Sequence, residues 1–177
     1  FAFMMYFLDF DRTLFDTNAF IEYVRTHSST EKMFMEDTET SLAYTLGLMA
    51  ESGALSFTAG ELSRFVYPDV PEFLRMLGNE AAIVTHGNPV FQQIKIASAL
   101  AGIPRVSALY AGDDLKGPFL APRYASYGSV QVFADDKPTE IESVAEHCPS
   151  IRLFEMRRDG ASGDGRWPVI RSLSELP

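Results

Sequence analysis

Three apolar stretches of the 177-residue sequence run directly into polar side chains that could do chemistry. FLDFDRT carries Asp9 and Asp11, IVTHGN carries Thr85, and FADD ends in Asp135 and Asp136. If these stretches are neighbouring parallel strands, the five side chains meet at the carboxyl edge of the sheet, where open α/β sheets bind ligands. Four carboxylates in one crevice repel each other unless a cation lies among them.

The cation that best suits such a cluster is Mg²⁺, which prefers oxygen ligands in octahedral geometry and usually keeps several waters. Asp9 and Asp135 can each supply one carboxylate oxygen, and the backbone carbonyl of Asp11 can supply a third ligand. The sequence therefore predicts a magnesium site at the ends of these strands.

Thr85 points to a second ligand, an anion. It ends a predicted strand just before a helix, and the free N–H groups of residues 86–88 at a helix start are suited to hold a phosphate. A lysine would complete this site. Lys95 lies two turns into the helix and is expected to face away, Lys137 directly follows the acidic pair, and Lys116, in a predicted loop after a strand, is the best placed of the three.

The elements that position these side chains alternate along the chain. Continuous apolar runs, typical of strands buried on both faces, cover residues 3–8, 81–85, 106–112, 130–136 and 151–156. Helices are predicted over 71–78, over 138–148, and after Asn88 as N-cap with Pro89 in the first turn and Gly102 past the end. Such alternation predicts a doubly wound α/β fold with a parallel sheet. The Gly-rich segment 157–168 is interpreted as a surface loop without chemistry.

The segment from Asn18 to Phe65 has a different texture, with polar and apolar residues mixed at helical spacing. It predicts three or four short helices that form a small bundle. The expected core of this bundle consists of its aromatic and methionine side chains: Phe20, Tyr23, Phe34, Met35, Tyr44 and Met49.

Composition narrows the possible partners. A formal net charge of −9 argues against a nucleic-acid or anionic-membrane surface, because such partners are bound by clustered Lys and Arg. The single cysteine, Cys148, cannot form an internal disulfide, which favours a reducing compartment and hence the cytoplasm. The apolar start of the chain is short and runs into Asp9, so it is interpreted as a strand rather than as a signal peptide or membrane span.

Four motifs together resemble those of the haloacid dehalogenase-like hydrolases. They are DFDRT, IVTHGN, Lys116 in DLKGP, and VFADDKP, in this order and at these separations. The resemblance covers nearly the whole chain, and YPDVPEFLRML is similar to the helix that re-enters the core in that family. It implies a Rossmann-like core over residues 1–17 and 66–177, a small all-helical cap over 18–65, and Mg²⁺-dependent phosphoryl transfer through an aspartyl-phosphate.

The same resemblance implies a role for each motif residue. Asp9 would be the nucleophile, and Asp11 would protonate the leaving oxygen and later activate water. Thr85 and Lys116, with His86 and Gly87 beside them, would hold the phosphoryl oxygens. The metal ligands would be Asp9, Asp11, Asp135 and Asp136, where Asp136 acts through water or instead orients Lys116.

One residue departs from the family pattern. Position 12 is usually small, often Gly, and here it is Arg12, which predicts that this backbone position does not need a positive φ. Its guanidinium is expected to pair with an acidic residue of the cap or reach solvent; the alternative is that it binds a second anionic group of the substrate.

The leading hypothesis is a phosphatase acting on a small phosphorylated metabolite, as a monomer or homodimer. A phosphomutase or dehalogenase on the same scaffold is the second hypothesis, and the dehalogenase suits Asp11 less well because a halide leaving group needs no proton. The third is a non-catalytic binding or regulatory domain.

Overall fold

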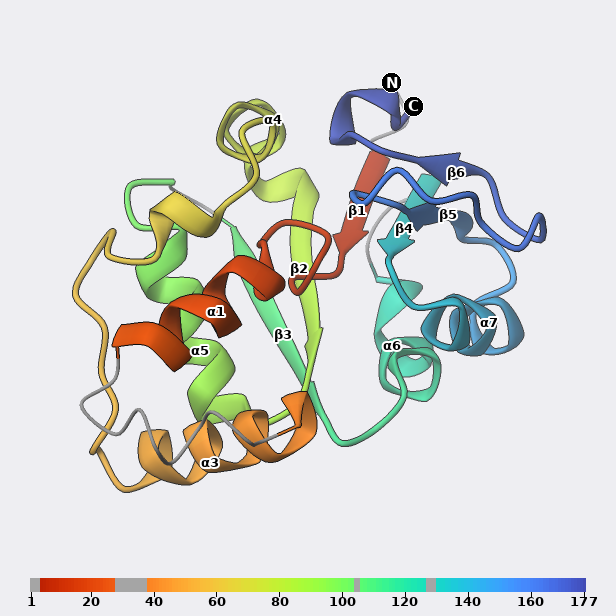
Figure 1. Cartoon of the computed structure of the whole chain (residues 1–177). Coiled ribbons are helices and arrows are strands. Elements are labelled where there is room, and N and C mark those ends of the chain that lie inside the picture. The colour runs from red at the N-terminus through yellow and green to blue at the C-terminus, as the bar shows by residue number, and fades with distance from the viewer. Residues whose placement is uncertain (1–3, 28–37, 104–105, 127–129) are drawn as a thin grey trace.

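A computed structural model describes residues 4–27, 38–103, 106–126 and 130–177 of the chain. In these residues six strands form one parallel sheet in the order β3-β2-β1-β4-β5-β6 (Figure 1). The strands are β1 (Met4–Leu8), β2 (Ala81–His86), β3 (Ser107–Gly112), β4 (Val130–Asp135), β5 (Arg152–Met156) and β6 (Val169–Ile170). The predicted doubly wound α/β fold is confirmed, and the short strand β6 is an addition to it.

Helices cover both faces of the sheet. They are α1 (Thr17–His27), α3 (Glu39–Glu51), α4 (Val70–Leu77), α5 (Pro89–Ala99), α6 (Lys116–Tyr124) and α7 (Pro138–His147), with short 3-10 turns at 63–65, 78–80 and 173–175. Figure 1 shows α6 and α7 on one face and α1, α3 and α5 on the other. Two separate apolar clusters fill the two layers, one with Phe7 and Leu120, the other with Leu8 and Phe91.

Local sequence signals define several helix ends as expected. The Asn88 side chain accepts a hydrogen bond from the Phe91 N–H at 3.0 Å, and Pro89 occupies the first turn of α5. Helix α4 ends at Gly78, which has a φ of 56°. These caps fix where the chain turns next to β2, and therefore where Thr85 lies.

The predicted bundle over 18–65 is represented by α1, α3 and the turn at 63–65, none of which joins the sheet. Phe20 is buried, and Tyr23 and Met49 pack against the same cluster, which also contains strand residues such as Leu8 and is therefore not a separate bundle core. Tyr44 is 69% exposed, so its assignment to the core was wrong. Tyr44 lies on the side of α3 opposite Leu42 and Leu46, which do pack inward. Phe34 and Met35 lie outside the described residues.

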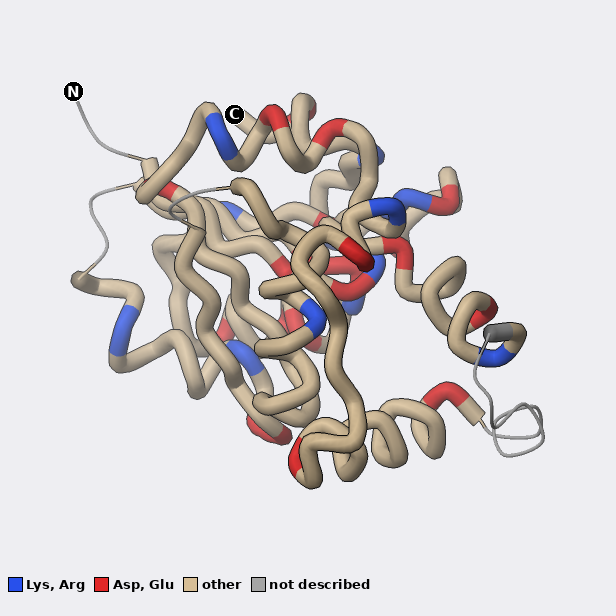
Figure 2. The backbone as a smooth tube through the Cα atoms, turned by 90° about the vertical axis from the view of Figure 1, so that its left-hand side faces the viewer, with Lys and Arg blue, Asp and Glu red and all other residues tan. Residues whose placement is uncertain are grey.

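Charge is mixed over the surface. In the view of Figure 2, Lys and Arg positions are dispersed over the elements among Asp and Glu positions. Among the described residues, no helix is both long and apolar enough to cross a membrane.

Candidate active site

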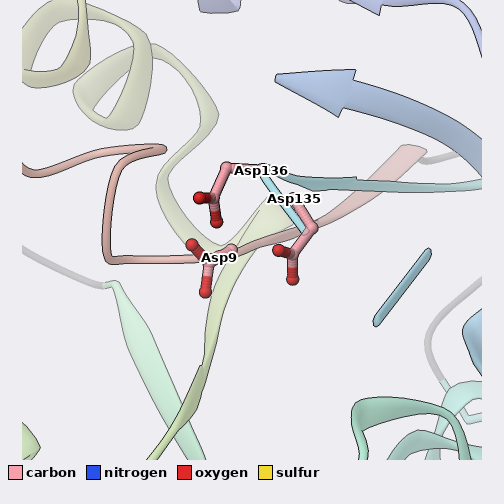
Figure 3. A group of neighbouring side chains, drawn as sticks. All are labelled: Asp9, Asp135 and Asp136. Carbon is pink, nitrogen blue, oxygen red and sulfur yellow. The ribbon is translucent and has the colours of Figure 1, made fainter. Parts of the chain in front are cut away.

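Three carboxylates meet where β1 and β4 end. Asp9 follows β1, Asp135 is the last residue of β4, and Asp136 comes next; each offers one oxygen, and these oxygens lie within 4.8 Å of one another (Figure 3). The arrangement follows from register, since Leu8 pairs with Ala134 and the Asp9 N–H donates to the Ala134 carbonyl at 2.9 Å. The predicted convergence is confirmed for Asp9, Asp135 and Asp136.

Lys116 lies between two of these carboxylates. Its Nζ donates to Asp9 Oδ1 and, at 2.6 Å, to Asp135 Oδ2, and its side chain is almost fully buried. Burial alone would lower the pKa of Lys116, but Asp135 and Asp9 raise it, so the lysine is charged. Lys116 is the first residue of α6, so its assignment to a loop was wrong; Lys137, the rival, is exposed.

The cluster retains more negative charge than Lys116 offsets. Burial, followed by the neighbouring charge of Asp135, raises the pKa of Asp9 well above its usual value. The same two causes raise the pKa of Asp136 to about 6. Buried carboxylates resist ionisation when like charges surround them, and a further cation would relieve this.

The donor set fits Mg²⁺. Asp9 Oδ2 is buried and has no hydrogen-bond partner among the described residues, while Asp9 Oδ1 is taken by Lys116. A buried, unpaired carboxylate oxygen beside two other carboxylates is a ready ligand for a hard divalent cation. The cluster could therefore hold a metal, with Asp9, Asp135 and Asp136 as its side-chain ligands.

Asp11 is held apart from this cluster by a set of donors. Lys95 Nζ lies 2.7 and 2.9 Å from its two oxygens, Thr17 Oγ1 donates at 2.6 Å, and Gln92 Nε2 donates at 3.0 Å. Burial would raise the pKa of Asp11, but Lys95 and these hydrogen bonds lower it to about 2. The expectation that Lys95 faces away from the site was wrong, because this buried lysine reaches back to the loop after β1.

The arrangement expected to bind phosphate at Thr85, His86 and Gly87 is found only in part. Thr85 is buried near the end of β2, and His86, which follows it, is half-buried. Gly87 has a φ of 99°, and its N–H donates to the Gly112 carbonyl at 2.8 Å. The expectation of a free N–H at Gly87 was therefore wrong. Asp113 and Asp114 lie in an exposed loop after β3.

Arg12 adopts a φ of 62°, so the prediction that this position avoids a positive φ was wrong. Its Nη2 lies 2.6 Å from Glu39 Oε2 and 3.3 Å from Asn18 Oδ1. The expected pairing with an acidic residue of segment 18–65 is confirmed. This contact joins the loop that carries Asp9 and Asp11 to the start of α3.

A cavity of about 890 Å³ opens beside Asp11. Its wall comes from the loop after β1, from α1 and α3, and from the start of α5. A cavity of this size can hold a small-molecule ligand.

The contacts of three residues in this region were not predicted from the sequence. Gln92 and Lys95 are one helical turn apart on α5, and both are buried although their neighbours on that helix are largely apolar. Arg158, in the segment interpreted as a loop without chemistry, donates to the Thr13 carbonyl at 2.9 and 3.1 Å. Polar residues at helical spacing on an apolar face were the signal for the first pair; the local sequence contains no comparable signal for Arg158.

No protein-family model matches the chain, and no curated protein matches its sequence. Solved structures do match. A haloacid dehalogenase-like hydrolase from Burkholderia xenovorans is 18% identical, with a TM-score of 0.66, over 99% of this chain and 95% of that one. This chain has the fold of the haloacid dehalogenase-like hydrolases.

Two further structures show the same haloacid dehalogenase-like fold. The HAD-hydrolase YfnB from Bacillus subtilis, bound to magnesium, is 15% identical, with a TM-score of 0.65, over 99% of this chain and 97% of that one. A dehalogenase with an intermediate complex is 19% identical, with a TM-score of 0.61, over 97% and 94%. These names cover more than one chemistry, so the reaction must be argued from the residues of this chain.

Proposed function

We propose that this chain is a Mg²⁺-dependent phosphomonoester hydrolase of the haloacid dehalogenase-like family. The observation that carries the proposal is the group Asp9, Asp135 and Asp136 with an unpaired buried oxygen on Asp9. Mg²⁺ held there would offset the negative charge of the carboxylates and of a phosphoryl group. A dehalogenase has no phosphoryl charge to offset, so a metal-binding cluster favours phosphoryl transfer.

Asp9 is the proposed nucleophile. One of its oxygens, Oδ1, accepts a hydrogen bond from Lys116, so the carboxylate has a defined orientation. With Oδ2 as the Mg²⁺ ligand, Oδ1 would be the oxygen that attacks phosphorus. Attack on phosphorus forms an aspartyl-phosphate and releases the alcohol; water then cleaves the phosphorus–oxygen bond and restores the carboxylate. Lys116 and Thr85 are the groups proposed to stabilise charge on the transferring group.

Asp11 is the proposed acid and base. Both of its oxygens accept hydrogen bonds from Thr17, Gln92 and Lys95, so Asp11 must exchange at least one of these bonds to reach the leaving oxygen. A carboxylate with a pKa of about 2 is ionised at neutral pH, which suits its role as base toward water; as an acid it must first gain a proton.

The remaining expectations belong to the same proposal. Residues 18–65 serve as a helical cap over a core of 1–17 and 66–177, and both α1 and α3 contribute to the wall of the cavity beside Asp11. The partner is a small phosphorylated metabolite rather than nucleic acid or membrane, the protein is a monomer or homodimer, and its location is the cytoplasm.

The test is hydrolysis of phenyl phosphate with Mg²⁺ and with EDTA, alongside 2-chloropropionate as a dehalogenase substrate. We expect phosphate release that requires Mg²⁺ and is lost in Asp9→Asn, and no chloride release. Phosphate release that persists in Asp9→Asn, or chloride release without phosphatase activity, would overturn the proposal.

A further inference from the structure

One wall of the cavity beside Asp11 would contact the alcohol part of the substrate. What this wall implies about that alcohol rests on the proposed phosphatase function. The cavity extends from Asp11 and Gly87 to α3, so an alcohol released from phosphorus has α3 on one side. The wall that α3 presents therefore meets the part of the substrate beyond the phosphate.

The charged groups near the phosphate end of this wall are already paired with protein groups. Arg12 pairs with Glu39 at 2.6 Å, and Asp11 pairs with Lys95 at 2.7 Å. At the other end of α3, Glu51 Oε1 accepts a hydrogen bond from Asn88 Nδ2 at 2.6 Å. A second anionic group on the substrate would have to break one of these pairs or reach Lys137, which lines the cavity from the loop after β4 and not from α3.

Between the two ends of α3 the wall is apolar. Tyr44 and Leu48 lie one helical turn apart, line the cavity, and are 69% and 48% exposed. Gly47 lies between them, where an added Cβ would come within 3.1 Å of the Asn88 side chain, so the glycine lets α3 approach the start of α5 closely. The cavity is thus bounded on this side by two apolar side chains that nothing in the described chain covers fully.

We propose that the leaving group is an uncharged alcohol with an apolar aryl or alkyl body that lies against Tyr44 and Leu48. The substrate class is then a phosphomonoester of an apolar alcohol, rather than one with a second carboxylate or phosphate. Burial of apolar surface supplies the binding energy, and each buried methylene is worth up to about fourfold in affinity.

The experiment compares three aryl phosphates with closely similar leaving groups: phenyl, 4-butylphenyl and 4-(3-carboxypropyl)phenyl phosphate. With Mg²⁺, we expect kcat/KM for the butyl compound to exceed that for phenyl phosphate by about tenfold, or about 1.4 kcal/mol. The carboxypropyl compound has the same length and should show no such gain. A preference for the carboxypropyl compound would overturn the proposal and favour an anion-binding role for Arg12.

The variant Tyr44→Ser/Leu48→Ser should reduce the butyl-to-phenyl ratio below about threefold, because hydrolysis of the butyl compound loses more than hydrolysis of phenyl phosphate. The matched control is Met76→Ser, because Met76 is 72% exposed on α4 and does not line the cavity. An unchanged ratio in the double variant would refute the proposal.

Calorimetry with the non-hydrolysable phenyl and 4-butylphenyl phosphonates measures the same preference without turnover. Tighter binding of the butyl compound, lost in the double variant, would support the apolar wall even if no phosphate were released and the proposed reaction failed. Equal affinities in the wild-type protein would contradict the apolar wall whether or not phosphate is released.

Discussion

Replacement of Arg158 by methionine should destabilise the fold, because this one side chain joins three segments. Its Nη1 donates to both Asp69 oxygens at 2.9 Å, its Nε and Nη2 donate to the Thr13 carbonyl, and Nη1 also reaches the Arg171 carbonyl at 3.2 Å. The loop after Asp9, the start of α4 and the C-terminal segment are thereby held together.

The size of the effect follows from burial. The Arg158 and Asp69 side chains are 10% and 24% exposed, between a solvated ion pair, worth about 0–1 kcal/mol, and a buried pair, whose disruption costs about 3–5 kcal/mol. Methionine keeps most of the side-chain volume but leaves Asp69 and the Thr13 carbonyl without these donors. We therefore expect the free energy of unfolding to fall by about 2–4 kcal/mol.

Urea denaturation followed by circular dichroism measures this free energy. The matched control is Arg166→Met, since Arg166 is 47% exposed and pairs with Glu142 and Asp164 at the surface. We expect the control to change stability much less than Arg158→Met does, because exposed ion pairs contribute little. If Arg158→Met loses no more stability than Arg166→Met, the reasoning about this network is wrong.

Three further predictions concern stability. Burial would raise the pKa of Asp69, but hydrogen bonds from Arg158, the Leu173 N–H and Ser172 lower it. The stability that ionised Asp69 contributes is therefore present above its unfolded pKa of about 3.9 and is lost as pH falls through the lower folded value. Acid titration should show a smaller loss of unfolding free energy in Asp69→Asn than in wild type, and equal losses would contradict this. Lys116→Met leaves two buried carboxylates without their cation and should lower the unfolding free energy in EDTA by about 3–5 kcal/mol; a loss below about 1 kcal/mol would show that Lys116 does not offset them. Gly117→Ala places a Cβ 2.1 Å from the Ser143 carbonyl oxygen, so its thermal midpoint should fall by several degrees, and an unchanged midpoint would refute the close packing of α6 on α7.

Strand positions and several helix ends were predictable because their causes are local. Continuous apolar runs marked β1 and β4, and Asn88 with Pro89 marked the start of α5. The meeting of Asp9 with Asp135 followed from parallel strands whose carboxyl ends share one edge. The roles assigned to these residues stay predictions until activity is measured.

Helix α6 was missed because its cause is not local. Its sequence, KGPFLAPRY, contains one glycine and two prolines and resembles a loop. Its first N–H, on Lys116, is satisfied by Glu140 of α7 at 2.9 Å, and Gly117 lets the two helices touch. Tertiary packing therefore starts this helix where the local sequence does not.

The errors at Lys95 and Arg12 have different physical reasons. A helical side chain leans toward the N-terminus, so a long lysine two turns into α5 can still reach Asp11 near the start of that helix. Arg12 was assigned an ordinary φ because left-handed conformations are uncommon outside glycine. Its ion pair with Glu39 accompanies the φ of 62°, but residue type alone does not reveal such a long-range partner.

The central claim is that Asp9 becomes phosphorylated, and the most direct measurement is the site of a trapped phosphoryl group. The Asp11→Asn variant, which lacks the proposed base for hydrolysis, is mixed with phenyl phosphate and Mg²⁺, quenched in acid and analysed by peptide mass spectrometry. We predict one phosphoryl group on Asp9, absent when Asp9 is also changed to Asn. A phosphoryl group on another residue, or wild-type turnover with no phosphorylated Asp9 in the trapped variant, would contradict the account.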